Sequence, residues 1–262
     1  LVALLLMNLT AVRYFGEMEF WFALIKVIAI ISLIIIGIIM IFTGFTTDAG
    51  VAAFSNMWNY GGWFPNGTMG FILSFQMVVF AFTGIELVGL TAGETEDPEK
   101  VIPMAINNIP LRIILFYVGS LAIIMSIYPW TAVNPSASPF VAVFTAVGIA
   151  AAAGIVNFVV LTSAASATNS GIFSTGRMIY ALAKRGHAPS SMRRLTHSSV
   201  PYQATIFSAA VLLITVVLNY VMPEAVFVMI TSISTFCFIF IWAMMVICHL
   251  KYRKKNPELA AQ

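Results

Sequence analysis

The chain has 262 residues, of which 60% are hydrophobic and only 9% carry a charged side chain. A soluble domain has about 25% charged residues, so this composition excludes an ordinary soluble protein and predicts an all-α integral membrane protein. The formal net charge of +3 becomes informative only when the positions of the charges are considered.

The chain contains seven apolar segments. Six are long enough to cross a hydrocarbon layer of about 30 Å, and the seventh is part of such a span. The segment that begins near Phe140 is rich in small residues and continues to about Ala183. We treat the whole chain, 1–262, as one transmembrane domain. In chain order we expect a partial span at 1–12 and six full spans at 20–42, 69–92, 112–130, 140–168, 202–221 and 225–249.

Apart from Lys26, which lies inside a span near its basic end, the lysine and arginine residues fall in or beside one set of connectors. The loops at 43–68 and 131–139 and the turn at Pro223 contain none. Because cytoplasmic loops carry the excess of basic residues, the basic connectors are expected to be cytoplasmic. These connectors are 13–19, 93–111, 184–201 and 250–262.

The expected span at 69–92 carries a glycine and an ionisable carboxylate near its centre, Gly84 and Glu86. A carboxylate at that depth is expensive, so Glu86 should face a protein interior or a water cavity. Gly84 makes a local break in the helix plausible, and discontinuous helices build transporter sites from freed backbone groups. The alternative is a continuous helix with Gly84 at a close helix contact and a protonated, hydrogen-bonded Glu86.

Two other spans carry polar residues at membrane depth. Lys26 lies one to two turns in from the basic end of its span, where it either snorkels to the interface or takes and releases a proton as a buried amine. Ser163, Ser166, Ser170 and Ser174 share one helix face, which suits either close helix packing or a polar pathway. Thr231 to Thr235 form a further polar cluster.

No spacing in the sequence indicates catalysis or metal binding, so we expect no catalytic residue, no metal and no cofactor. The three histidines lie in or beside basic connectors without a ligand partner at useful spacing. Cys237 and Cys248 are separated by roughly 16 Å of helix rise and cannot pair with each other. The basic residues follow the positive-inside pattern, so no nucleic-acid partner is expected.

Three groups of residues match motifs of one known family. They are Phe82–Glu86 with Gly93–Lys100, the stretch Arg13–Lys26, and Asn169-Ser170-Gly171 with Ser174, Arg177-Met178 and Ala181–Ala183. Together they resemble bacterial amino acid permeases of the amino acid–polyamine–organocation superfamily. Ile85–Gly89 and Phe158–Ser166 are most similar to the D-serine/D-alanine/glycine permeases within it.

The resemblance implies a leucine-transporter-like five-plus-five inverted-repeat fold, normally of twelve spans. The chain would hold the end of span four and spans five to ten, without the rest of spans 1–4 and without spans 11–12. It implies proton-coupled symport of small neutral amino acids, such as D-serine, D-alanine and glycine, across the bacterial plasma (inner) membrane. The partners implied are the amino acid, a proton and the lipid bilayer. An exchanger of the same fold, or a permease for aromatic, basic or branched amino acids, is the alternative.

The resemblance also implies roles for individual residues. The broken span would contact the amino group of the substrate through backbone carbonyls. Its residues are Ala81, Phe82, Thr83, Gly84, Ile85 and Glu86. Lining roles would fall to Ser163, Ser232 and Ser234. Lys26 would occupy a sodium-like site and couple transport to a proton, with Ser166 facing it and Glu86 as a second proton-coupling residue.

Overall fold

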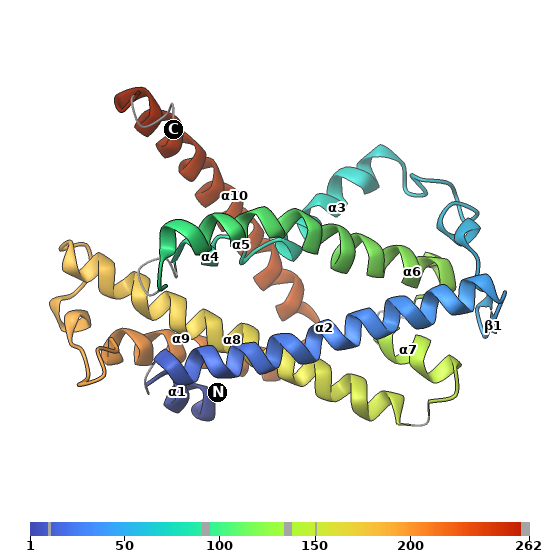
Figure 1. Cartoon of the computed structure of the whole chain (residues 1–262), viewed down its shortest axis with the longest axis horizontal. Helices are drawn as coiled ribbons and strands as arrows, with labels where there is room; N and C mark the ends of the chain where they lie inside the picture. The colour runs from blue at the N-terminus through green and yellow to red at the C-terminus, as the bar shows by residue number, and fades with distance from the viewer. Residues whose placement is uncertain (10–11, 91–94, 134–137, 150, 258–262) are drawn as a thin grey trace.

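The computed structural model describes residues 1–9, 12–90, 95–133, 138–149 and 151–257 of the chain, and most of them are helical (Figure 1). The elements are α1 (Val2–Asn8), α2 (Val12–Phe42), β1 (Thr46–Thr47), β2 (Gly50–Val51), η1 (Phe54–Met57), α3 (Gly67–Ala81), α4 (Leu87–Leu90), α5 (Pro98–Arg112), the π-helical η3 (Ile113–Gly119), α6 (Ser120–Ile127), η4 (Trp130–Ala132), α7 (Pro139–Ala146), α8 (Ala152–Lys184), η5 (Ser190–Arg193), α9 (Tyr202–Val221) and α10 (Pro223–Lys255).

Five helical stretches in the described part of the chain are long and apolar enough to cross a membrane. They are Gly16–Phe42, Pro98–Ile127, Ala152–Lys184, Tyr202–Val221 and Val226–Lys255. The expected span at 69–92 is present as the shorter helix α3, an interruption and then α4. The prediction of an all-helical membrane protein is therefore confirmed.

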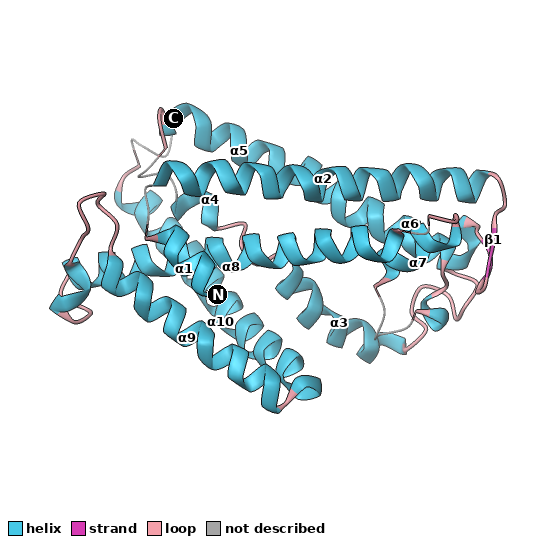
Figure 2. Ribbon diagram, turned by 90° about the horizontal axis from the view of Figure 1, so that it is seen from below, coloured by secondary structure: helices cyan, strands magenta, loops and turns pink. Residues whose placement is uncertain are grey.

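Helix α8 organises the packing, because α1, α2, α7 and α9 all contact it. Helix α2 runs beside α8 in the opposite direction, and both views show the two helices side by side (Figures 1 and 2). Helix α3 packs instead against α10, whose C-terminal half extends away from the other helices (Figure 1). Residues on α2 and α8 can therefore meet, whereas the interrupted span belongs to a neighbouring group of helices.

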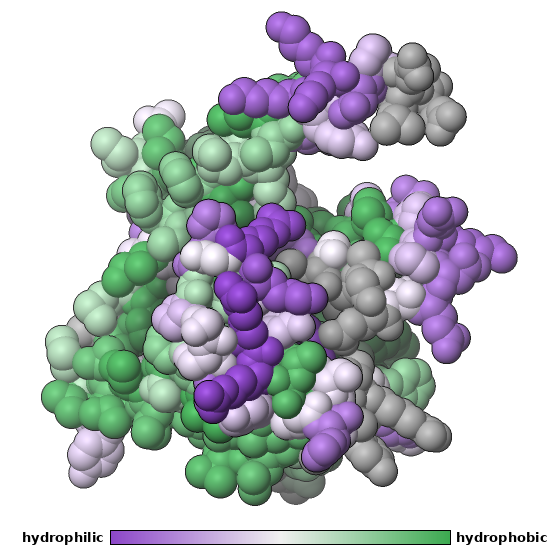
Figure 3. Space-filling view, turned by 90° about the vertical axis from the view of Figure 1, so that its left-hand side faces the viewer, coloured by the Kyte–Doolittle hydropathy of each residue, from purple (hydrophilic) through white to green (hydrophobic). Residues whose placement is uncertain are grey.

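Hydrophilic residues gather at one end of the molecule, which Figure 3 views directly. The connector after α8, the start of α5 and the end of α10 all lie toward this end in Figure 1. Three connectors that the sequence marks as basic thus share one end, as the positive-inside rule requires. The β1–β2 hairpin, with Thr46 opposite Val51, lies at the other end.

Two connectors expected from charge are continuous with the spans that follow them. Residues 13–19 form the first turns of α2, and α5 begins at Pro98 and continues through η3 into α6. Charged residues show where a chain leaves the apolar layer, and a helix continues past that point when its residues still favour helical structure.

The segment from near Phe140 to about Ala183, expected to be continuous, forms two helices. Helix α7 ends before Gly148, whose φ is +82°, and α8 follows. A glycine adopts that left-handed conformation without strain.

Gly176 lies where α8 and α9 approach closely. A Cβ atom added there would lie 2.8 Å from the Oγ1 atom of Thr205 and 3.2 Å from its Cα atom. We expect Gly176→Ala to lower the free energy of unfolding of the full-length protein by about 1–3 kcal/mol, because backbone has to shift. The matched control is Gly171→Ala on the same helix, where a Cβ would meet no atom within 4 Å. Thermal unfolding in detergent measures both, and Gly176→Ala melting no lower than Gly171→Ala would contradict the prediction.

Candidate functional site

The interruption between α3 and α4 is the first feature of the candidate site. Helix α3 ends at Ala81 and α4 begins at Leu87, and Gly84 between them has a φ of +101°. Within the described part of the chain, no backbone N–H donates to the carbonyl oxygens of Ala81, Phe82 or Thr83. Backbone groups at membrane depth need a polar partner from protein, water or ligand. The segment is therefore interrupted, and the continuous-helix alternative does not describe this structure.

Glu86 is half-buried and holds the interruption together locally. The backbone N–H of Gly84 donates to both carboxylate oxygens of Glu86, at 3.1 Å to Oε1 and 3.2 Å to Oε2. The hydroxyl of Thr83 donates to the carbonyl oxygen of Phe80 at 2.8 Å. The acidic side chain thus satisfies a donor that a regular helix would have paired internally.

Aromatic and polar contacts fix the interruption against neighbouring helices. Phe82 stacks on Tyr117 of η3 with ring centroids 5.3 Å apart, and Phe80 makes an edge contact with Phe227 of α10. On α10, the hydroxyl of Ser232 accepts a hydrogen bond of 2.6 Å from the side-chain Nε2 of Gln76 on α3. The structure therefore places Ser232 on the helix that supports the interruption, with the half-buried Ser234 two residues further along α10.

A second polar cluster joins α2 to α8 and α1. The amine of Lys26 donates to the Oγ atom of Ser166 at 2.8 Å, as the family resemblance implied. Ser166 donates in turn to Oε2 of Glu19 at 2.6 Å, and Nδ2 of Asn169 donates to Oε1 of Glu19 at 3.1 Å. Nδ2 of Asn8 donates to Oδ1 of Asn169 at 2.6 Å. Ser166 is 2% exposed and Asn169 1%, so the cluster is an interior feature of the helix bundle.

Sequence reasoning missed Glu19, Asn169 and Asn8. Glu19 lies within the expected connector 13–19, although it precedes Lys26 by seven residues and so lies two helical turns from it on the same face. Asn169 follows Ser166 by three residues and shares its face. The seven-residue spacing of Glu19 and Lys26 is the signal for a shared helix face. It applies only if both residues lie in one helix, and the structure shows this because α2 begins at Val12.

Lys26 also borders a cavity of about 740 Å³ between α2, α7 and α8. Its lining is mostly apolar, and the polar side chains on it belong to Lys26, Ser32 and Ser163. No residue of the interruption lines this cavity. The structure therefore groups Ser163 with Lys26 and Ser166, and it groups Ser232 with the interrupted span.

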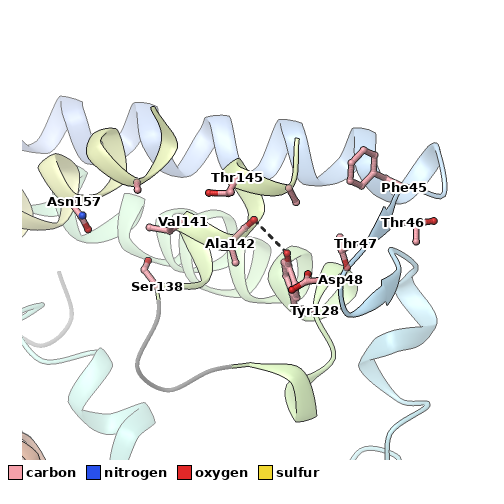
Figure 4. Close-up of a pocket in the computed structure, with 12 residues that line it drawn as sticks. Phe45, Thr46, Thr47, Asp48, Tyr128, Ser138, Val141, Ala142, Thr145 and Asn157 are labelled. Atoms are coloured by element: carbon pink, nitrogen blue, oxygen red, sulfur yellow. Dashed lines mark hydrogen bonds between the residues drawn. The ribbon is translucent and has the colours of Figure 1, made fainter. Parts of the chain in front are cut away.

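A cavity of about 610 Å³ lies at the hairpin end of the molecule, and none of the predicted site residues lines it (Figure 4). Tyr128, which follows the last residue of α6, donates from its hydroxyl to the carbonyl oxygen of Ala142 at 3.4 Å. Burial, together with the charge and hydrogen bond of Asp48, raises the pKa of Tyr128 to about 12. The phenol therefore keeps its proton at physiological pH and acts as a donor beside the carboxylate.

Long apolar helices, an interrupted span and a buried polar contact between two spans define a multi-pass helical membrane protein. A family model described as amino acid permease matches residues 1–258, and the chain belongs to the amino acid permease family.

Curated relatives agree with this assignment. The chain is 69% identical to the "Uncharacterized transporter YdgF" and 66% identical to the "Amino-acid permease AapA", both of Bacillus subtilis, and each match covers 99% of the chain. It is 53% identical to the "D-serine/D-alanine/glycine transporter" of Escherichia coli K12, again over 99% of the chain. These matches cover 56–57% of the relatives, so the chain spans a little over half of their length.

Proposed function

We propose that the full-length protein is a secondary active transporter that imports small neutral amino acids, such as D-serine, D-alanine and glycine, together with a proton. The family assignment supports amino acid transport, and the relative named for D-serine, D-alanine and glycine supports the substrate class. The membrane is a bacterial plasma membrane. The connectors 13–19, 93–111, 184–201 and 250–262 face the cytoplasm in this proposal, because they carry the basic residues.

The interruption binds the amino group of the substrate. The carbonyl oxygens of Ala81, Phe82 and Thr83, which accept no backbone N–H of the described residues, are suited to accept hydrogen bonds from an ammonium group. Gly84 and Ile85 provide the turn, and Glu86 keeps its shape through the bonds from Gly84. Ser232 and Ser234 line this site from α10, whereas Ser163 lines the cavity beside Lys26.

Lys26 couples transport to the proton. The single observation that carries this part is the 2.8 Å bond from its amine to Ser166, because it joins α2 to α8 through an ionisable side chain. With the proton bound, the ammonium holds the two helices together. The loaded bundle opens the midplane site inward, the proton then leaves, and the weakened contact lets the empty bundle rock back to face outward. Glu86 is the second proton-coupling residue in this scheme.

Uptake by the full-length protein in liposomes tests the proposal. An inwardly directed proton gradient should drive accumulation of labelled glycine and D-alanine, and a protonophore should abolish it. Unlabelled D-serine should compete strongly, whereas phenylalanine and lysine should compete weakly. Uptake that ignores the protonophore and needs internal amino acid would identify an exchanger. Preference for aromatic or basic amino acids over alanine would overturn the substrate class.

A further inference from the structure

We propose that Glu19 receives the proton that Lys26 releases, through the hydroxyl of Ser166, and passes it on toward the cytoplasmic end of α2. The inference rests on the proposed proton coupling and adds its exit route. Glu19 lies seven residues before Lys26, which places it roughly 10 Å nearer to the basic end of the helix. It is half-buried, so it lies between the interior cluster and the end of the bundle.

The hydrogen bonds between the two ionisable groups already run in one direction. The amine of Lys26 donates to Oγ of Ser166 at 2.8 Å, and Oγ donates to Oε2 of Glu19 at 2.6 Å. A hydroxyl that accepts from a cation and donates to an anion bridges the two groups through a continuous chain of hydrogen bonds. Because Ser166 is 2% exposed, bulk water does not compete for these two bonds.

The neighbouring amides are oriented by the same carboxylate. Asn169 directs its NH₂ group at Oε1 of Glu19, so its carbonyl oxygen faces Asn8 and accepts from the NH₂ group there. Nδ2 of Asn8 donates also to the backbone oxygen of Leu4, while its Oδ1 atom is buried and accepts no bond from the described residues. Both amide donors therefore point along the network toward Glu19, which makes Glu19 its acceptor end.

Few other charges face this cluster. Helix α1 has no ionisable side chain, and α9 carries only tyrosines. Glu17 on α2 is exposed, and Arg13 precedes it on that helix. On α8, Arg177 lies over the ring of Phe173 with its guanidinium carbon 3.3 Å from the ring centroid, and Lys184 is near the C-terminal end. Lys26 and Glu19 are thus the ionisable pair inside the described network.

The proposed step changes only N–H and O–H bonds. Nζ of Lys26 gives a proton to Oγ of Ser166 while the hydroxyl proton of Ser166 moves to Oε2 of Glu19. The products are a neutral amine and a neutral carboxylic acid, so no isolated charge is left buried. Glu19 then loses the proton to water at the basic end. The serine hydroxyl is regenerated with its hydrogen bonds reversed.

Glu19→Gln in the full-length protein tests the relay, with Glu17→Gln as the matched control. Glu17 lies two residues away, is exposed and carries the same charge. Two modes are measured in liposomes: uptake driven by a proton gradient, and exchange of labelled for unlabelled glycine, in which the proton stays bound. A positioned acid–base side chain contributes about 10²–10⁴-fold to the rate of a step that moves a proton. We therefore expect Glu19→Gln to slow driven uptake by about 10²-fold and to flatten the pH profile of that uptake. Exchange should stay near the wild-type rate, and Glu17→Gln should behave as wild type in both modes.

Loss of both modes by Glu19→Gln would show a structural role alone, and full driven uptake would show no role; either result overturns the proposal. If Glu19→Gln does not reach the membrane, Glu19→Asp takes its place, because it keeps an ionisable carboxylate but shortens its reach toward Ser166. The relay predicts slower driven uptake with exchange near the wild-type rate for this variant, and equal effects on both modes would overturn it. Wild-type uptake that ignores the proton gradient would instead reject the proposed coupling itself, so the two failures are distinguishable.

Discussion

Lys26→Ala in the full-length protein is expected to abolish accumulation of glycine against its gradient. The variant removes the amine that binds the proton and the 2.8 Å bond that joins α2 to α8 through Ser166. We expect driven uptake to fall by about 10²-fold or more, as for loss of an essential acid–base group. The remaining uptake should be downhill and independent of external pH.

Two further lysine variants make this result specific. Lys26→Arg keeps a positive charge that is not released in proteins, so the contact between α2 and α8 stays closed and driven uptake is lost as well. Lys184→Ala is the matched control, because Lys184 is an exposed lysine near the end of α8, with its amine 5.5 Å from the centroid of the Tyr180 ring. It should transport as wild type. Accumulation by Lys26→Ala with the wild-type pH dependence would exclude Lys26 as the proton carrier and direct attention to Glu86.

Gly84→Ala is expected to damage substrate binding through the backbone alone. The φ of +101° at Gly84 is unfavourable for a residue with a Cβ atom, and such strain costs about 1–3 kcal/mol. Space is not the difficulty, because an added Cβ would meet only Cδ1 of Leu87, at 3.9 Å. Relief of the strain would move the N–H that bonds to Glu86 and the carbonyls proposed to hold the substrate. The apparent affinity for glycine should therefore fall by about tenfold, which corresponds to 1.4 kcal/mol.

Gly89→Ala provides the matched control for this prediction. Gly89 lies five residues along the chain in α4, its φ is not positive, and a Cβ there would meet no atom within 4 Å. Competition binding with unlabelled glycine, measured on both purified variants, separates backbone strain from a general effect of alanine in this segment. Equal affinities for the two variants would contradict the role assigned to the conformation of Gly84.

The interrupted span could be predicted because two residue types conflict with a continuous helix in lipid. Gly84 lowers helix stability and Glu86 requires a polar environment, and both signals lie within three residues. The contact of Lys26 with Ser166 depended on the family resemblance, since a lysine near the end of a span is equally compatible with snorkelling. Its geometry needed the structure, because the two residues are 140 positions apart in the chain.

Glu19 and the split at Gly148 could not be predicted for a different reason. Charge and hydropathy locate the borders of the apolar layer, but they do not show whether a helix continues beyond a border. Charge alone therefore predicts that Glu19 is a connector residue, although it lies in α2 and accepts a hydrogen bond from Ser166 of α8. Gly148 is one of several glycines in an apolar, small-residue segment, and only its backbone conformation distinguishes it. The grouping of Ser163 with Lys26 likewise follows from helix packing.

Direct measurement of proton movement tests the central claim, that substrate entry and proton entry are one event. The full-length protein is reconstituted in liposomes that contain a pH-sensitive dye, with no gradient present, and glycine is added outside. The account predicts acidification of the interior that requires glycine, scales with glycine influx and is absent with Lys26→Ala. Glycine influx by the wild-type protein without any change in internal pH would contradict it.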